Sequence, residues 1–332
     1  MGVNFAFVNV LIIGLLSALA VTSQPAPAKK PAVKSTGNVA RAPDPNDPVE
    51  KEYAKLLEDD DAAQEEIDKW IREEEAFKAA GAGISKAALA ARIDQRFGSV
   101  RRAYKDFLAR HPKHARARLA YGSFLNEIGD EEEAVIEWEK ARDLDPKNPA
   151  AWNNLANHYG HRGPIDKAFA CYEKAIELNP KESTYVWNLA TTTYLFRRDA
   201  MQYYKITETQ VFDRSLDLYH RALKLDPKNF ILAHDFAQSY YGIKPLRTAE
   251  ALAAWNEALK LASDDVEREG IYLHLARVEL NSGHFDQART HLLVVTNQMH
   301  STLRNRLMRN LTEKEKQPGA TNSSAANIAQ PK

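Results

Sequence analysis

Apolar side chains in the stretch 149–180 recur at the spacing of an α-helix, in two successive runs. The recurring positions are Trp152, Leu155, Ala156 and Tyr159 in the first run and Ala168, Tyr172 and Ala175 in the second. At about 100° per residue, each run forms one apolar stripe along its helix. The small residues allow two helices to approach closely, and the aromatic residues fill the groove beside them. The pattern predicts a helix pair that ends before Pro180, because proline lacks an N–H donor.

The helix-pair pattern repeats along the chain. Pro146 and Pro180 are 34 residues apart, and other positions follow the same offset. The equivalent positions are Gly122 with Ala156 and Ala190, Gly129 with Gly163, Ala134 with Ala168, Trp138 with Tyr172, and Ala141 with Ala175. A fixed period of this length indicates a repeat architecture in which neighbouring units stack.

The spacing and the residue types resemble the tetratricopeptide repeat (TPR) family. The copy at 149–182 matches the family pattern of Trp, Leu-Gly, Tyr, Ala, aromatic, Ala and Pro, except that Ala156 replaces the glycine. The copy at 115–148 has Arg118 in place of the first tryptophan. The resemblance implies an all-α, right-handed superhelical TPR solenoid with about five repeats.

Three weaker copies and a capping helix continue the predicted array. The third copy carries an insertion near 195–209, since Pro180 and Pro227 are 47 residues apart. We expect the insertion to lengthen two helices by about two turns into a projecting hairpin. Its Tyr203-Tyr204 pair would form a partner-specific knob or pack on the next repeat. The fourth copy is centred on Phe236-Ala237, the fifth on Leu275-Ala276, and residues 301–311 form the cap.

Upstream of the clear repeats, two helical stretches of opposite charge are expected. Residues 100–112 resemble the second helix of a degenerate copy, with a partner helix around 84–97. Residues 49–80 form an acidic helical lead-in, whose Trp70 and Phe77 are available to dock onto the start of the array. The acidic and basic stretches either neutralise each other or serve to bind a partner.

The ends of the chain have compositions that do not build a core. Residues 1–20 carry an apolar run that ends in Ala18-Leu19-Ala20, as in a signal peptide. No Lys or Arg precedes the run, so an uncleaved membrane anchor is the alternative. Residues 21–48 form a linker rich in Pro, Ala and Lys, and 312–332 form a tail; both are expected to be disordered. The solenoid therefore occupies 81–311.

Composition excludes several classes of function. Lys plus Arg and Asp plus Glu both number 45, which gives no global field for binding nucleic acid. The single cysteine, Cys171, permits no intrachain disulfide. His158 and His161 are too few for a metal site, and no phosphate loop or catalytic motif is present. We expect no enzyme activity, no cofactor and no metal.

Polar residues recur at two positions on the predicted first helices, about 150° from the core stripe. Such asparagine and glutamine side chains can hydrogen-bond to the backbone of an extended peptide, as the resemblance to Asn-lined grooves of the family implies. The alternative is that these positions are simply solvated. The candidate groove residues are Ser123, Asn154, Asn157, Trp187, Asn188, Thr191, Tyr194, His234, Asp235, Gln238, Tyr241 and Arg277.

The sequence thus favours a non-catalytic scaffold that binds a protein or peptide in the concave groove, within an exported (periplasmic or secreted) or envelope-associated assembly. A membrane would be a partner only through an uncleaved N-terminal segment. The alternative function is an accessory or regulatory subunit of an enzyme that acts on cell-wall or glycan material. A repeat fold by itself does not name the ligand.

Overall fold

The computed structural model describes residues 44, 46–79, 81 and 83–316. The predicted signal peptide, almost all of the linker and residues 317–332 of the tail lie outside these ranges. The described chain forms helices and contains no strand. It divides into two compact units, which we call the first unit (described residues up to Pro180) and the second unit (Lys181 onward).

The first unit contains six helices. They are α1 (Pro48–Ala79), α2 (Lys86–Arg110), α3 (Ala115–Glu127), α4 (Glu131–Leu144), α5 (Pro149–Arg162) and α6 (Ile165–Leu178). The pairs α3/α4 and α5/α6 are the two best copies of the repeat, and each pair packs closely along its length. The all-α helix-pair fold predicted from the 34-residue period is confirmed.

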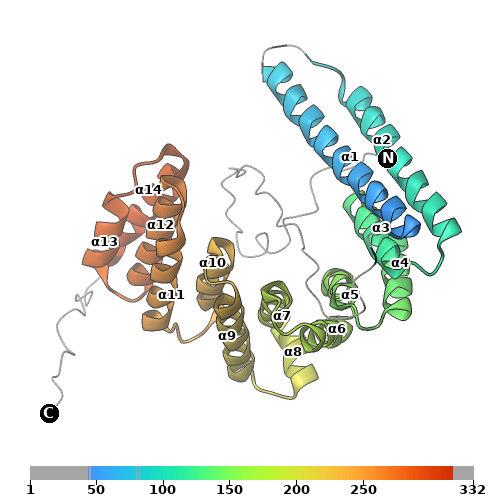
Figure 1. Ribbon diagram of the computed structural model, residues 1–332. Coiled ribbons are helices and arrows are strands. Elements are labelled where there is room, and N and C mark those ends of the chain that lie inside the picture. The colour runs from blue at the N-terminus through green and yellow to red at the C-terminus, as the bar shows by residue number, and fades with distance from the viewer. Residues whose placement is uncertain (1–43, 45, 80, 82, 317–332) are drawn as a thin grey trace. The chain divides into compact units, whose positions relative to one another are not determined.

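The second unit holds the weaker copies (Figure 1). Its elements are α7 (Ser183–Leu195), α8 (Arg197–Tyr204), α9 (Glu208–Leu225), α10 (Phe230–Ser239), the 3₁₀ turn η1 (Tyr240–Gly242), α11 (Thr248–Leu261), α12 (Asp265–Asn281), α13 (Phe285–Leu293), η2 (Gln298–His300) and α14 (Ser301–Glu315). The pairs are α7/α9, α10/α11 and α12/α13, and α14 packs against α12 and α13 as the cap.

Small residues stand where the paired helices approach most closely. A Cβ added to Gly122 would lie 2.5 Å from Cδ1 of Trp138 and 3.0 Å from the carbonyl oxygen of Ala134. The equivalent residues Ala156 and Ala190 are fully buried. Close packing at this position therefore brings the second helix against the first, and the aromatic ring of Trp138 covers the contact.

Local sequence signals set the ends of the helices. Asn148 caps α5 through a hydrogen bond from the N–H of Ala150 to its side-chain oxygen, and Pro149 occupies the first turn. The glycines of three turns between paired helices, Gly129, Gly163 and Gly283, have φ values between 77° and 84°. Only glycine adopts this backbone conformation without steric cost, so these residues fix the turns.

Arg118 replaces the repeat's tryptophan for a reason that the structure makes clear. Its guanidinium lies 2.6 Å from the carboxylate of Glu137 on α4, and Lys140 bonds to the other carboxylate oxygen. Glu137 is buried, with 6% of its surface exposed. A buried carboxylate requires a cation or donors. The pair therefore holds α3 against α4 at the position where the next copy has Trp152.

The helices α1 and α2 form a long hairpin at the start of the first unit, side by side in Figure 1. The inward positions of α1 follow a heptad pattern, with steps of three and four residues. They are Tyr53, Leu56, Asp60, Ala63, Ile67, Trp70 and Glu74. The buried Asp60 carboxylate accepts a hydrogen bond of 2.7 Å from the hydroxyl of Tyr104. Burial raises the pKa of Asp60.

Two predictions for this region are wrong. Helix α2 runs unbroken from Lys86 to Arg110, so the expected helix around 84–97 is not separate, and α1 is the packing partner. Phe77 does not dock, since 57% of its surface is exposed near the hairpin tip. Tyr53 supplies the contact to α3 instead, through a hydrogen bond to the carbonyl oxygen of Arg116.

Several of the opposite charges of this region meet within the hairpin and its neighbour. Arg96 of α2 lies 2.9 Å from Asp59 and 3.0 Å from Glu66 of α1. Arg116 of α3 pairs with Glu50. Of the two alternatives for these charge runs, these contacts favour mutual neutralisation.

The insertion of the third copy also differs from the predicted hairpin. Helix α7 ends at Leu195, α8 is a separate helix of 8 residues, and α9 alone is lengthened, to 18 residues. Lys205 adopts the left-handed conformation after α8, with φ at 55°, and Thr207 with Gln210 forms a capping box that starts α9. Because a left-handed residue and a capping box break the chain here, the insertion folds back onto α9.

Tyr203 and Tyr204 of the insertion take different positions. The guanidinium of Arg214 on α9 lies 3.9 Å from the ring centre of Tyr204. Tyr203 keeps 36% of its surface exposed. Tyr204 therefore packs on the neighbouring helix, while Tyr203 stays at the surface.

Nowhere in the described ranges is there a helix long and apolar enough to span a membrane.

Two glycines of the first unit test whether the closest approach of paired helices requires a residue without a side chain. We expect Gly122→Ala to lower the free energy of unfolding by about 1–3 kcal/mol, because the new methyl group overpacks against Trp138 and Ala134. Gly160→Ala is the matched control: its Cβ would meet only the Tyr172 hydroxyl, at 3.8 Å. That change should leave stability unchanged or raise it by up to about 1 kcal/mol. Urea unfolding followed by circular dichroism measures both, and equal effects would contradict this requirement.

Candidate functional site

In the first unit, polar residues of the predicted ladder meet across neighbouring repeats. Asn154 of α5 donates a hydrogen bond of 3.2 Å from Nδ2 to Oγ of Ser123 on α3. Both side chains are partly exposed. Because α3 and α5 are the first helices of successive repeats, this bond joins two ladder residues across the two repeats.

Asn157, the third ladder residue of the first unit, serves its own repeat. Its side-chain oxygen accepts a hydrogen bond of 2.7 Å from the hydroxyl of Tyr172 on α6. This bond joins the two helices of the pair while Asn157 stays partly exposed. Asn157 therefore fixes the orientation of the second helix's aromatic residue as well as contributing to the polar surface.

In the second unit, α7 provides only part of the predicted surface. Trp187 and Asn188 are partly exposed, and the indole Nε1 of Trp187 is buried without a hydrogen-bond partner. Thr191 and Tyr194 are each 6% exposed. The expectation that Thr191 points out of the packing is therefore wrong, and Tyr194, expected on or near the same surface, is buried as well. The hydroxyl of Thr191 lies 2.9 Å from that of Tyr219 on α9.

The burial of Thr191 and Tyr194 has a structural cause. Helices α8 and α9 both pack against α7, and a Cβ on Gly242 would collide with the Tyr194 hydroxyl. Tyr219 of α9 therefore covers Thr191, while Phe212 of α9, with ring centres 6.0 Å apart, and η1 enclose Tyr194. Burial also raises the pKa of Tyr194.

The first helices α10 and α12 carry the remaining candidate residues. His234 and Gln238 are partly exposed, as is Tyr241 of the following turn η1, and Arg277 is exposed. Asp235 is 8% exposed, so it lies inside the packing rather than outside it. Its Oδ1 is 3.8 Å from Nδ1 of His234.

Three of these residues meet in one place, together with two residues that sequence reasoning did not select for the site. We call this set the histidine–aromatic cluster: His234, Tyr241, Trp255, His274 and Arg277. The rings of Trp255 and His274 stack at 4.1 Å with an angle of 6°. His234 stands edge-on to both, at 5.2 Å from Trp255 and 5.4 Å from His274.

Tyr241 and Arg277 complete the cluster. The Tyr241 hydroxyl lies 3.0 Å from Nδ1 of His274, and the guanidinium of Arg277 lies 4.5 Å from the centre of the Tyr241 ring. A cation over an aromatic face is attracted by the ring quadrupole. The contacts therefore run from an exposed guanidinium, through a phenol and an imidazole, to the fully buried indole of Trp255.

Burial governs the electrostatics of the cluster. It lowers the pKa of His274 well below the ordinary value of 6.5, and the charges of His234, Arg277 and His300 lower it further. Burial also raises the pKa of Tyr241. A neutral imidazole can accept at one nitrogen and donate at the other, so the cluster offers hydrogen bonding and stacking at neutral pH.

The sequence held partial signals for the two missed residues. His274 precedes Arg277 by three residues and so shares its helix face. Trp255 occupies the aromatic position of the second helix, which predicts packing but no contact with a neighbouring repeat.

Among the residues that the structure describes, no group of three or more metal-ligating side chains comes together. His158 and His161 show a pKa lowered by burial.

Comparison with known families and proteins gives matches to repeat proteins. Tetratricopeptide repeat family models match residues 149–182 and 86–149. A TPR repeat-containing protein of Methanocaldococcus jannaschii is 26% identical over 142 residues, 43% of this chain and 22% of that protein's length. Photosystem I assembly protein Ycf3 of Synechococcus is 27% identical over 138 residues, 39% of this chain and 79% of that protein. This chain therefore spans about a fifth of the archaeal relative.

Solved structures of repeat proteins are also similar in part. MamA is 22% identical, with a TM-score of 0.42 over 51% of this chain and 85% of MamA. The TPR protein YrrB is 15% identical, with a TM-score of 0.48 over 64% of this chain and 98% of YrrB. A repeat protein of Parabacteroides merdae is 16% identical, with a TM-score of 0.41 over 79% of this chain and 99% of that protein.

The depressed pKa of His274 predicts a loss of stability in acid. Below about pH 6.5 the unfolded chain binds a proton on this imidazole and the folded chain does not, so stability present above that pH is lost as the pH falls. We expect a slope of up to about 1 kcal/mol per pH unit. His274→Gln should reduce the slope, whereas His220→Gln, at an exposed position of α9, should not. Urea unfolding followed by tryptophan fluorescence at neutral and acid pH measures this. An unchanged slope in His274→Gln would refute it.

Proposed function

We propose that this chain, a protein that contains tetratricopeptide repeats, is a non-catalytic scaffold that binds a protein or peptide partner. The binding surface we propose has two parts. One is the set of ladder residues on the first helices of each unit, and the other is the histidine–aromatic cluster of the second unit. One observation carries the proposal: polar ladder residues on successive first helices meet each other, as Asn154 of α5 and Ser123 of α3 do.

The ladder of the first unit has the chemistry that an extended peptide needs. An asparagine amide both donates and accepts, so it can satisfy a backbone N–H or C=O with little demand on the partner's side chains. Ser123 and Asn154 remain partly exposed while they are hydrogen-bonded to each other. The bond therefore holds both side chains in place and leaves them accessible to a partner. Side chains that are held in place lose less entropy on binding.

The histidine–aromatic cluster of the second unit supplies the residue types that carry binding energy. Aromatic residues and arginine dominate the energetics of protein interfaces. Tyr241 and His234 are partly exposed and rest on Trp255 and His274, so their orientation is fixed before a partner arrives. The cluster therefore serves as an anchor within the second unit.

We also propose that the scaffold works in an exported or envelope-associated assembly. Support comes from the sequence: the apolar run between Phe5 and Ala20 is short for a membrane span and ends in Ala18-Leu19-Ala20, a small-x-small pattern that signal peptidases cleave.

Photo-crosslinking tests the binding surface. Peptides selected from a random library on the purified full chain are incubated with variants that carry a photoreactive phenylalanine at Ser123, Gln238 or Glu177. We expect crosslinks at Ser123 or Gln238, which are partly exposed on first helices, and none at Glu177, which is exposed on the second helix α6. Failure to select any peptide, or crosslinking at Glu177 alone, would reject the proposed surface.

N-terminal sequencing of the native protein tests export. We expect the mature chain to begin at Val21, directly after the small-x-small pattern. A chain that keeps Met1 and fractionates with membranes would instead establish the uncleaved anchor. A chain that keeps Met1 and stays in the cytosol would refute export.

A further inference from the structure

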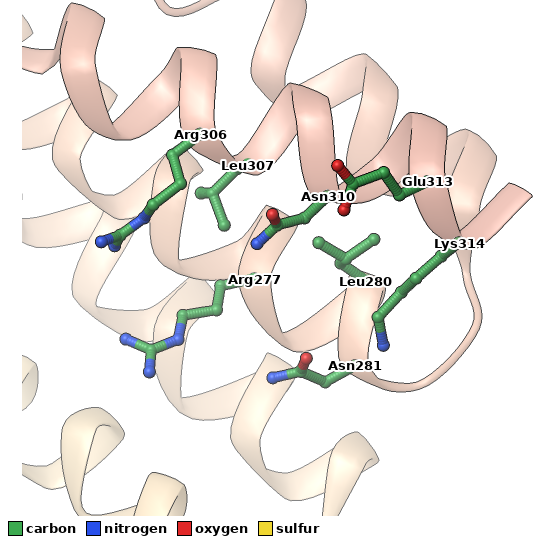
Figure 2. Close-up of a pocket in the computed structure, with 8 residues that line it drawn as sticks. All are labelled: Arg277, Leu280, Asn281, Arg306, Leu307, Asn310, Glu313 and Lys314. Atoms are coloured by element: carbon green, nitrogen blue, oxygen red, sulfur yellow. The ribbon is translucent and has the colours of Figure 1, made fainter.

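A pocket lies between α12 and the capping helix α14, at the end of the second unit. Arg277, Leu280 and Asn281 line it from α12, while Arg306, Leu307 and Asn310 line it from α14, with Glu313 and Lys314 at one end. Figure 2 shows the guanidinium groups of Arg277 and Arg306 extending to the same end of the pocket, with Lys314 at the other. The pocket belongs to the second unit alone.

Two arginines near the pocket are held by other groups of the protein. Arg304 of α14 donates to the carbonyl oxygen of Leu292, and Arg289 of α13 pairs with Glu315. Among the described residues, Arg277, Arg306 and Lys314 form no ion pair with an acidic side chain. The pocket therefore holds three cations against one carboxylate, that of Glu313.

The other lining residues add donors and an apolar floor. Asn281 and Asn310 each carry an amide NH₂ that donates two hydrogen bonds. Leu280 and Leu307 are 3% and 4% exposed and form the floor between the two helices. Arginine presents a planar fork of donors that matches a carboxylate in a bidentate arrangement, and the floor can take up the methylene groups of a glutamate side chain.

We propose that this pocket binds acidic side chains of an extended peptide segment of the partner. The proposal rests on the proposed function and adds the partner's chemistry: a segment with glutamate or aspartate where it passes α12 and α14. Charge complementarity selects this occupant, because unpaired cations beside amide donors favour a carboxylate over a neutral or basic side chain. Arg277 joins the pocket to the histidine–aromatic cluster, since the same guanidinium lies over Tyr241.

Fluorescence anisotropy with the full chain tests the pocket. The probe is a short dye-labelled peptide that alternates glutamate with alanine, and the reference probe has glutamine at every glutamate. We expect the glutamate peptide to bind about tenfold more tightly. Arg306→Gln should weaken its binding about tenfold, because one charged hydrogen-bonding group is lost.

Arg309→Gln is the matched control, since Arg309 lies on the same helix, is exposed and does not line this pocket. It should leave the affinity unchanged, and circular dichroism checks that both variants fold. Equal affinity for the two probes, or equal losses in the two variants, would overturn the proposal. If the library peptides crosslink at Gln238 but bind without any dependence on acidic residues, the pocket proposal fails and the scaffold proposal stands. If no library peptide binds, the scaffold proposal fails as well.

Discussion

The close approach of two helices at a position that holds almost no side chain is the contact on which the described fold depends. At Gly122 there is no room for a methyl group between α3 and α4, and Ala156 and Ala190 repeat the arrangement with one carbon more. Such a contact fixes both the spacing and the rotation of the two helices, because interlocking side chains permit few crossing geometries. Once rotation is fixed, the outward positions are fixed as well.

This constraint explains why much of the fold can be derived from the sequence. Helix periodicity, the proline at the end of each second helix and the turn glycines are local signals, and each acts within a few residues. The substitution at Arg118 shows the limit of such signals. The family pattern marks it as a defect, whereas the structure turns it into a buried ion pair with Glu137.

What the sequence could not predict depends on contacts between segments that are distant along the chain. Thr191 occupies a position that a periodic pattern places at the surface, yet Tyr219 of α9 covers it. Phe77 is a large apolar residue of the kind that docks against a neighbouring helix, but it lies near the hairpin tip and 57% of its surface is exposed. The histidine–aromatic cluster joins η1, α10, α11 and α12, so no single helix contains its signal. Periodicity defines the face of a helix, but not which other segment will cover it.

Arg277 belongs both to the histidine–aromatic cluster and to the pocket beside α14, and it therefore links the two. Its guanidinium lies over Tyr241 and also lines the pocket beside α14, and Tyr241 contacts His274, which stacks on the buried Trp255. We expect an anion that draws the guanidinium toward the pocket to change the electric field at the phenol and, through the imidazole, at the indole. Occupancy of an exposed site would then alter the surroundings of a tryptophan that is itself fully buried.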